Sequence, residues 1–338
     1  MSPLRDRVAA PSTLPIPVSI DGVSWRPVTV ADIDAIFDCA RAIDVVEHPH
    51  YVTSREEIEE DFGHSYVDLE RDSLVVLDAH GAALAYGLVV LHPSQNTLVR
   101  SILMGGVRPS VRGRGIGRVL LAWQEARALQ QFAGSDKKLP GWMIVWTFER
   151  ATGTVRLAER SGFRIARYFL ELRRDLSKPI VAKEIAGFDI VQFDASQSEA
   201  VRLARNDAFR DHWGSQPTTE ENWNEIVARS TFRPDLSFLA IAPDGEVAGF
   251  VLSEVNEEDF APQGFSSAYI DLVGVPRAFR QRGIAPALLT RTLEATVAAG
   301  LQMAVLDVDA ESPTGALGLY THLGFTEANR SMQLNREF

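Results

Sequence analysis

Apolar and polar residues alternate along the chain with two periods, one typical of strands and one typical of amphipathic helices. Pro243-Asp-Gly245 is typical of the tight turn inside a hairpin. In the second half, the pattern predicts strands at 188–193, 237–241, 247–252, 268–275, 303–308 and from 325 onward, and helices at 196–209, 219–228, 283–299 and 314–323. This order predicts a mixed α/β fold.

The first half repeats the same order of elements, and two motifs repeat with it. The segment Gly106-Val-Arg-Pro-Ser-Val-Arg-Gly-Arg-Gly-Ile-Gly117 matches Gly274-Val-Pro-Arg-Ala-Phe-Arg-Gln-Arg-Gly-Ile-Ala285 at an offset of 168 positions. Further along, Arg156-Leu-Ala-Glu-Arg-Ser-Gly-Phe163 matches Gly318-Leu-Tyr-Thr-His-Leu-Gly-Phe325 at an offset of 162 positions. We therefore expect an arm at 1–20, a first domain at 21–176 and a second, related domain at 180–338.

Length and charge fit this organisation. A chain of 338 residues suits two domains. The net charge is −11, and residues 1–178 hold 22 basic and 22 acidic residues, so the excess lies in the second half. An acidic domain disfavours nucleic acid as a partner and favours a cationic acceptor through electrostatic steering. The alternative, that the acidic surface only keeps the protein soluble, remains open.

The sequence also limits location and metal chemistry. No run approaches the roughly 20 apolar residues that span a bilayer, and the N-terminus lacks the apolar block of a signal peptide, so we expect a cytoplasmic protein. Cys39 is the single cysteine and has no disulfide partner within the chain. His48 and His50 lack further ligands at a suitable spacing, so no metal site is predicted.

Each repeated glycine-rich segment lies between a predicted strand and a predicted helix. A helix start leaves backbone N–H groups unpaired and partly positive, so such a corner is a site for an anion. Glycine lets the backbone approach a phosphate closely, and arginine adds forked donors. The residues expected to hold the anion are Arg112, Gly113, Arg114, Gly115, Ile116 and Gly117 in the first copy and Arg280, Gln281, Arg282, Gly283, Ile284 and Ala285 in the second.

With both motifs present twice, the sequence resembles the GNAT superfamily of N-acetyltransferases, and in particular its tandem members, among which mycothiol synthase is the best-known arrangement. The resemblance implies acetyl-CoA as co-substrate and a V-shaped sheet whose central strands separate around the pantetheine. It places pantetheine on the backbone of Val273 and Val275, with Val107 as the copy-one equivalent, and its pyrophosphate on the glycine-rich corners. Ser312 occupies a position where relatives often carry Asn to contact pantetheine.

The resemblance also implies that catalysis takes place in the second copy. It assigns protonation of the departing thiolate to Tyr320, where the first copy has Ala158. Relatives often carry a carboxylate at the position of Tyr269. Asp271 lies two residues later on the same strand face and is the leading candidate for the base, although a purely structural role stays open, and Glu254 is the reserve.

The sequence thus predicts an acetyl-CoA-dependent N-acetyltransferase that acts on a primary amine by direct transfer in a ternary complex. Two alternatives remain: a non-catalytic acyl-CoA sensor or scaffold, and a mycothiol synthase-type enzyme that acetylates a cysteinyl sugar. The acceptor, the acyl-chain preference, CoA binding by the first copy and the oligomeric state, with a homodimer as one candidate, are left open.

Overall fold

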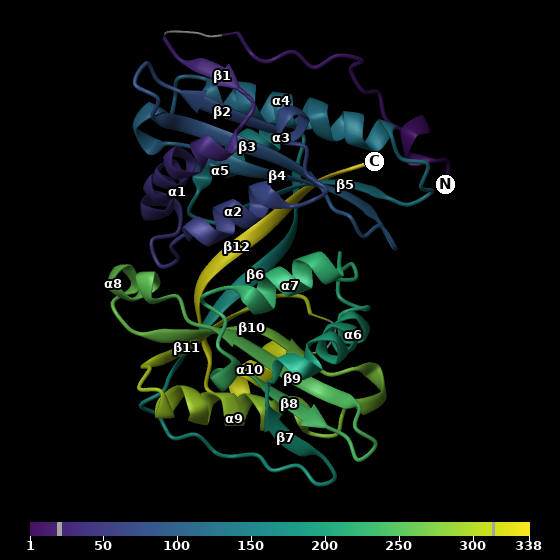
Figure 1. The fold of residues 1–338 in the computed structure, drawn as a ribbon, viewed down its shortest axis with the longest axis vertical. Coiled ribbons are helices and arrows are strands. Elements are labelled where there is room, and N and C mark those ends of the chain that lie inside the picture. The colour runs from purple at the N-terminus through teal and green to yellow at the C-terminus, as the bar shows by residue number, and fades with distance from the viewer. Residues whose placement is uncertain (19–21, 313–314) are drawn as a thin grey trace. The chain divides into compact units, whose positions relative to one another are not determined.

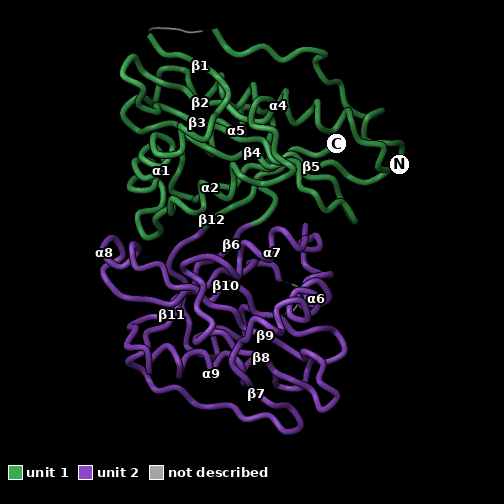
Figure 2. The backbone as a smooth tube through the Cα atoms, viewed as in Figure 1, with its two compact units in different colours: residues 1–167, 331–338 green, residues 168–330 purple. Residues whose placement is uncertain are grey.

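The computed structural model describes residues 1–18, 22–312 and 315–338 and divides the chain into two compact units (Figures 1 and 2). Unit 1 comprises Met1–Arg167 and Ser331–Phe338, and unit 2 comprises Tyr168–Arg330. Each unit has a mixed sheet with helices on both faces.

In unit 1 the strands follow the order β1-β2-β3-β4-β5-β12. Its strands are β1 (Ser24–Arg26), β2 (Ser73–Leu77), β3 (Ala83–Leu91), β4 (Val99–Val107), β5 (Gly141–Phe148) and part of β12 (Thr326–Glu337); its helices are α1 (Ile33–Glu47), α2 (Arg55–Gly63), α3 (Leu69–Asp72), α4 (Ile116–Ala133) and α5 (Thr152–Arg160). Leu88 packs in the core with α1, whereas the neighbouring Gly87 faces Leu120 of α4. Because successive strand residues point to opposite faces, α1 and α4 cover opposite sides of this sheet.

Unit 2 has the strand order β6-β11-β10-β9-β8-β7. Its elements are β6 (Arg164–Asp175), β7 (Asp189–Gln192), β8 (Phe238–Ile241), β9 (Val247–Glu254), β10 (Ser267–Gly274) and β11 (Met303–Asp309), with α6 (Ser198–Ala208), α7 (Glu220–Ala228), α8 (Phe260–Gln263), α9 (Ile284–Ala298) and α10 (Ala316–His322). Phe250 packs with α6 and α7, and Val251 packs with α9 on the other face. The two units thus share one architecture, as the sequence repeat predicts.

The last strand of each sequence repeat pairs in the sheet of the other repeat. In β12, Ser331–Glu337 run antiparallel to β5 of unit 1, and in β6, Phe169–Asp175 run antiparallel to β11 of unit 2. The buried side chain of Leu334, 0% exposed, accordingly belongs to the core of unit 1. The compact units therefore have different boundaries from the repeats at 21–176 and 180–338.

Most predicted elements are present within a residue or two, including the hairpins around Gly81 and Gly245. The N-terminal arm packs on unit 1, where Leu4 is 0% exposed and the backbone N–H of Leu4 donates to Lys137 at 2.8 Å. The predicted helix start at 314 and the junction of arm and first domain at 19–21 lie outside the described residues.

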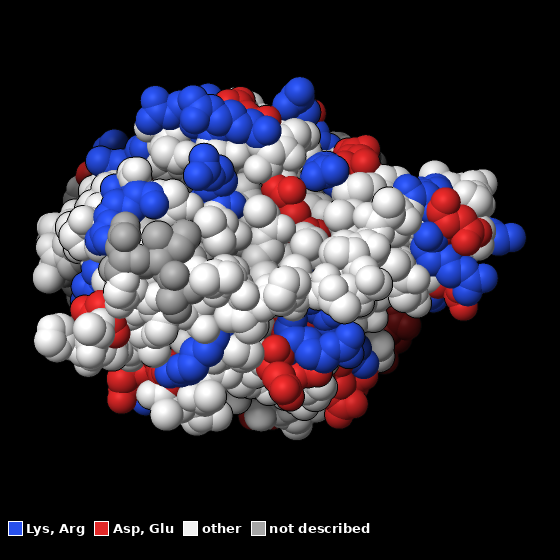
Figure 3. Space-filling view, turned by 90° about the horizontal axis from the view of Figure 1, so that it is seen from above, with Lys and Arg blue, Asp and Glu red and all other residues white. Residues whose placement is uncertain are grey.

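Two surface properties bear on the predicted location and partners. Within the described part of the chain, none of the helices has the length and apolar character needed to cross a membrane. Basic and acidic side chains lie close together on the face seen in Figure 3. Both signs of charge thus share this face.

Leu334→Ala tests the pairing of the C-terminal strand. Removing this buried side chain leaves a cavity and should destabilise unit 1 by about 2–5 kcal/mol. Hydrogen exchange should quicken at the paired amides of β5, while exchange in β8 and β9 stays unchanged, because those strands belong to unit 2.

Leu203→Ala is the matched control, since Leu203 is 55% exposed and its truncation should change stability by no more than about 0.5 kcal/mol. Faster exchange in β8 and β9 of the Leu334→Ala variant would contradict the observed strand pairing.

Candidate active site

The corner between β10 and α9 combines two features of an anion site. Gly283 is the N-cap of α9 with φ 79°, and no side chain caps the helix, so N–H groups of its first turn have no side-chain acceptor. Gln281 has φ 63° and is the one non-glycine residue with a positive φ among the described residues. Left-handed positions near a helix start form a concave backbone surface that binds anions, and strain of this kind is typical of functional sites.

One arginine in each corner, Arg280 and Arg112, has partners within the protein. The guanidinium of Arg280 donates to the carbonyls of Val275 at 3.2 Å and Ala208 at 2.8 Å and pairs with Asp211 at 3.2 Å. Arg112 in unit 1 likewise donates to the carbonyl of Val107 at 2.9 Å. These contacts hold both guanidinium groups against the loop backbone.

Beyond this corner, the two central strands of unit 2 separate. Strands β10 and β11 pair in parallel only over Ser267–Tyr269 and Met303–Val305, and the rest of β10 pairs with β9 alone. A cleft of about 870 Å³ occupies the opening. It brings together ten residues predicted from the sequence: Asp271, Val273, Val275, Arg280, Gln281, Gly283, Ile284, Ala285, Ser312 and Tyr320.

Asp271 lies at an irregularity of β10. The register with β9 shifts between Ile270 and Leu272, and such bulges change the direction of a side chain. Burial raises the pKa of Asp271, while the charges of Arg229 and Arg205 act in the opposite direction. The carboxylate therefore lines the cleft with compensating positive charge nearby.

A second carboxylate faces the same opening from β11. Asp307 lines the cleft, and its Oδ2 accepts a hydrogen bond from the Tyr269 hydroxyl at 2.9 Å. Asp307 is exposed at the opening, yet partial desolvation of its carboxyl within the cleft raises its pKa to about 6. The Tyr269 hydrogen bond opposes this shift, and Glu171 and Asp271 add repulsion. The pKa of Asp307 thus lies well above that of an ordinary aspartate.

Tyr320 is positioned by core packing at the end of the cleft. Its side chain is 7% exposed, and its ring meets Phe325 edge-on with 5.9 Å between centroids. Burial raises the pKa of Tyr320 to about 12. The hydroxyl therefore stays protonated at neutral pH and is available as a proton donor.

Two predicted residues of unit 2 lie outside this lining. Glu254 pairs with Arg229 at 3.5 Å and accepts from Thr231 at 3.3 Å, so its carboxylate is engaged beside the strand end. Arg282 donates to the carbonyl of Ala278 at 3.1 Å and lies over the ring of Phe279. The other ten predicted residues of unit 2 line the cleft.

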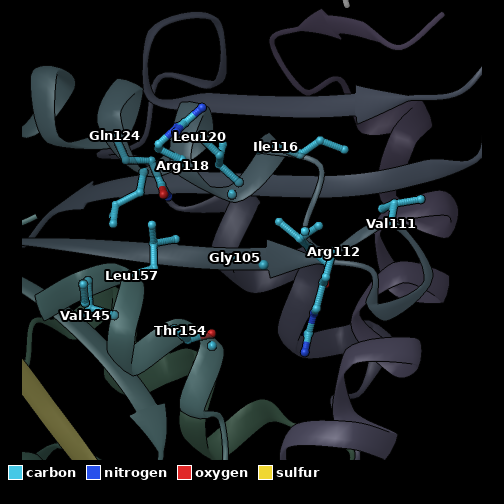
Figure 4. Close-up of a pocket in the computed structure, with 18 residues that line it drawn as sticks. Gly105, Val111, Arg112, Ile116, Arg118, Leu120, Gln124, Val145, Thr154 and Leu157 are labelled. Atoms are coloured by element: carbon cyan, nitrogen blue, oxygen red, sulfur yellow. The ribbon is translucent and has the colours of Figure 1, made fainter. Parts of the chain in front are cut away.

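Unit 1 contains a smaller counterpart. Its pocket of about 270 Å³ is lined by Arg112, Gly113, Gly115, Ile116, Gly117 and Val107, as predicted, but not by Arg114. Figure 4 shows Leu120, Gln124 and Leu157 gathered in this pocket. The amide of Gln124 donates to the carbonyls of Leu88 and Met104 on β3 and β4.

The walls of this pocket lack the acid and base groups of unit 2. Ala158 stands at the place of Tyr320 and is 1% exposed, and Leu103 and Val145 stand at the places of Asp271 and Asp307. In unit 1, Leu103 and Val145 are still paired partners between β4 and β5. The sheet of unit 2 therefore opens earlier along the strands, at the level of its two carboxylates.

Sequence reasoning identified Asp271 but missed Asp307. The available signal was a carboxylate in the middle of the otherwise apolar run from Met303 to Val308, which alternation alone assigns to a buried strand. What the sequence did not reveal was the register, which places Asp307 two residues beyond the last residue of β11 that pairs with β10.

A sheet that opens between two central parallel strands beside an anion-binding corner defines the acyl-CoA-dependent transferase class. Comparison with known proteins supports this assignment, since residues 198–325 match the model of the acetyltransferase (GNAT) family. The chain is 32% identical to the mycothiol acetyltransferase of Thermobispora bispora over 65% of this chain and 70% of that protein. The chain therefore belongs to the GNAT superfamily, as a tandem member, and is an acetyl-CoA-dependent N-acetyltransferase.

Solved structures agree with the tandem architecture. A GCN5-related N-acetyltransferase from Sphaerobacter thermophilus is 27% identical, with a TM-score of 0.69, over 96% of this chain and 97% of that one. The tandem GNAT protein from the clavulanic acid biosynthesis pathway is 15% identical, with a TM-score of 0.68, over 93% of this chain and 98% of that one. This second likeness concerns the fold alone.

Gly283→Ala tests the anion corner. A left-handed conformation costs an alanine about 1–2 kcal/mol, so the loop should relax in the free protein and need that energy to re-form around the ligand. The Kd for CoA should rise about 5–30-fold, measured by titration calorimetry.

Gly245→Ala provides the matched control, because Gly245 also has a positive φ, of 89°, and lies in the β8–β9 turn. It should carry a similar cost in stability and leave the Kd for CoA unchanged. An equal loss of affinity in both variants would mean that the corner at Gly283 does not bind the cofactor.

Proposed function

We propose that unit 2 catalyses transfer of the acetyl group from acetyl-CoA directly to a primary amine, and that unit 1 is a structural or acyl-CoA-binding partner. The observation that supports assigning catalysis to unit 2 is the difference between the cleft of unit 2 and the pocket of unit 1. The cleft has Tyr320, Asp271 and Asp307 on its walls, and the pocket has Ala158 and Val145 on its walls.

The residues of unit 2 take part in binding and proton transfer in a fixed order. The backbone of the β10–α9 corner holds the diphosphate, and the backbone of Val273 and Val275 supports the pantetheine arm. Ser312 lies at the end of this path as an additional contact for pantetheine. The thioester then lies beside the buried Tyr320, which gives its proton to the sulfur as the carbon–sulfur bond breaks.

Amine attack also needs a base, because a primary amine is largely protonated at neutral pH. A carboxylate at the opening takes this role, and Asp271 is the residue that the sequence favours. The reserve candidate, Glu254, is held by Arg229. Asp307 is a third carboxylate that could act as the base.

The acceptor is a small primary amine, and the carboxylates of the cleft favour a cationic one. A second candidate is acetylation of a cysteinyl sugar, which the likeness to mycothiol acetyltransferases supports. The tyrosine at position 269, where relatives often carry a carboxylate, distinguishes this cleft from the cleft of a mycothiol synthase-type enzyme.

We place the reaction in the cytoplasm, where acetyl-CoA is available. A purely CoA-binding sensor would have no use for a proton donor at Tyr320.

Tyr320→Phe removes the proposed acid. Because a positioned acid contributes roughly 10²–10⁴-fold in rate, kcat should fall by about that factor while the KM for acetyl-CoA stays within about threefold. Thiol release from acetyl-CoA with a panel of primary amines measures both constants.

Tyr51→Phe in unit 1 is the matched control, since Tyr51 is 40% exposed, and it should keep the wild-type kcat. Full activity in Tyr320→Phe would remove the proposed acid, and with it the assignment of catalysis to unit 2.

A further inference from the structure

We propose that Asp307 is the general base that accepts the proton of the acceptor ammonium, and that Tyr269 is the positioning residue that holds its carboxylate at the opening. This inference rests on the proposed function of unit 2. It assigns the base to β11, whereas the sequence favoured Asp271 on β10.

The first support is the register of the central strands. Tyr269 and Val305 are the last residues through which β10 and β11 pair with each other. Asp307 is two residues beyond this point, where β11 still pairs with β6 on its other side. Side chains two apart on a strand share a face, and the Tyr269 hydroxyl reaches the Asp307 carboxylate at 2.9 Å. The Tyr269 hydroxyl thus orients a carboxylate on the neighbouring strand.

The second support is the comparison between the units. Leu103 and Val145 form a paired position in the ladder of unit 1, and their equivalents in unit 2 are Asp271 and Asp307. In unit 2 the two strands have already separated at this level, and both carboxylates line the opening. The positions that continue the ladder in unit 1 thus carry acidic groups at the cleft in unit 2.

The third support is the charge around each carboxylate. Burial raises the pKa of Asp271, and the guanidinium groups of Arg229 and Arg205 in its surroundings oppose that rise by stabilising the anion. Asp307 faces the Tyr269 hydroxyl and the acidic groups of Asp271 and Glu171.

Glu171 is itself paired with Arg173 at 2.6 Å and accepts from the amide of Asn329 at 3.0 Å, so its effect on Asp307 is partly neutralised. Desolvation of the carboxyl within the cleft, with a smaller contribution from the remaining repulsion, brings the pKa of Asp307 to about 6. A base whose pKa lies near the working pH is effective in proton transfer.

The proton balance is as follows. The bound ammonium R–NH₃⁺ gives one proton to Asp307, and the neutral amine attacks the thioester carbonyl to form the carbon–nitrogen bond. The carbon–sulfur bond breaks, Tyr320 protonates the thiolate, and the second nitrogen proton returns through water to the tyrosinate. Asp307 then releases its proton to solvent, so the products are the amide, CoA–SH and one H⁺.

The test is the pH dependence of kcat/KM with acetyl-CoA and spermidine or D-glucosamine as acceptors. Wild type should show an acidic limb near pH 6. Asp307→Asn should lose that limb, fall about 10²–10⁴-fold at pH 7, and then rise tenfold per pH unit, because only amine deprotonated in solution reacts.

Two further variants separate the proposed roles. Asp271→Asn should keep the limb and move it to lower pH, because loss of a like charge lowers the pKa of Asp307. Tyr269→Phe should move the limb to higher pH, because the lost hydrogen bond had stabilised the charged form. Asp244→Asn, in the exposed β8–β9 turn, is the matched control and should leave the profile unchanged.

Carboxyl NMR titration of the free protein supplies a readout that does not depend on turnover. Asp307 should titrate near pH 6 in wild type and higher in Tyr269→Phe. A limb that survives in Asp307→Asn and vanishes in Asp271→Asn would overturn the proposal, as would titration of Asp307 near pH 4. Absence of both CoA binding and turnover in wild type would instead refute the proposed function of unit 2.

Discussion

The separation of two parallel strands governs the chemistry of this protein. In a parallel sheet, each central strand bonds to both neighbours, and β10 gives up one of these partners after Tyr269. The freed backbone and the side chains beyond that point then face a cleft instead of a core. In unit 1 the strands stay paired two residues further, through Leu103 and Val145, and the remaining pocket is about a third of the size.

The glycine-rich corner at the start of α9 is followed by this opening, and that sets it apart from the corner in unit 1. A left-handed glycine at the start of a helix occurs in both units, at Gly115 and Gly283, and each corner is tied down by an arginine that bonds to the strand before it. The corners alone would make two equivalent phosphate sites. What differs is what lies beyond them: an apolar wall with Gln124 in unit 1, and a cleft with a buried tyrosine and two carboxylates in unit 2.

The sequence predicted the tandem architecture and most of the cleft, because glycine-rich corners and strand periodicity are local properties. Tyr320 was proposed from the resemblance to the GNAT superfamily, and Asp271 from its place on the same strand as Tyr269, where relatives often carry a carboxylate. The exchange of β6 and β12 between repeats was not predicted, since each strand has the same alternation whichever sheet it joins. Asp307 was missed because its exposure depends on where two strands stop pairing, which is a property of tertiary register. The roles of Arg280 and Arg112 in fixing the loops likewise depend on carbonyls that the folded chain brings near.

A crystal structure with acetyl-CoA bound tests the central claim most directly. The account predicts that the diphosphate lies on the backbone of residues 281–285 and that the thioester enters the opening between β10 and β11, with its sulfur within hydrogen-bond reach of the Tyr320 hydroxyl. A thioester bound in unit 1 beside Ala158, with the cleft of unit 2 empty, would contradict the account.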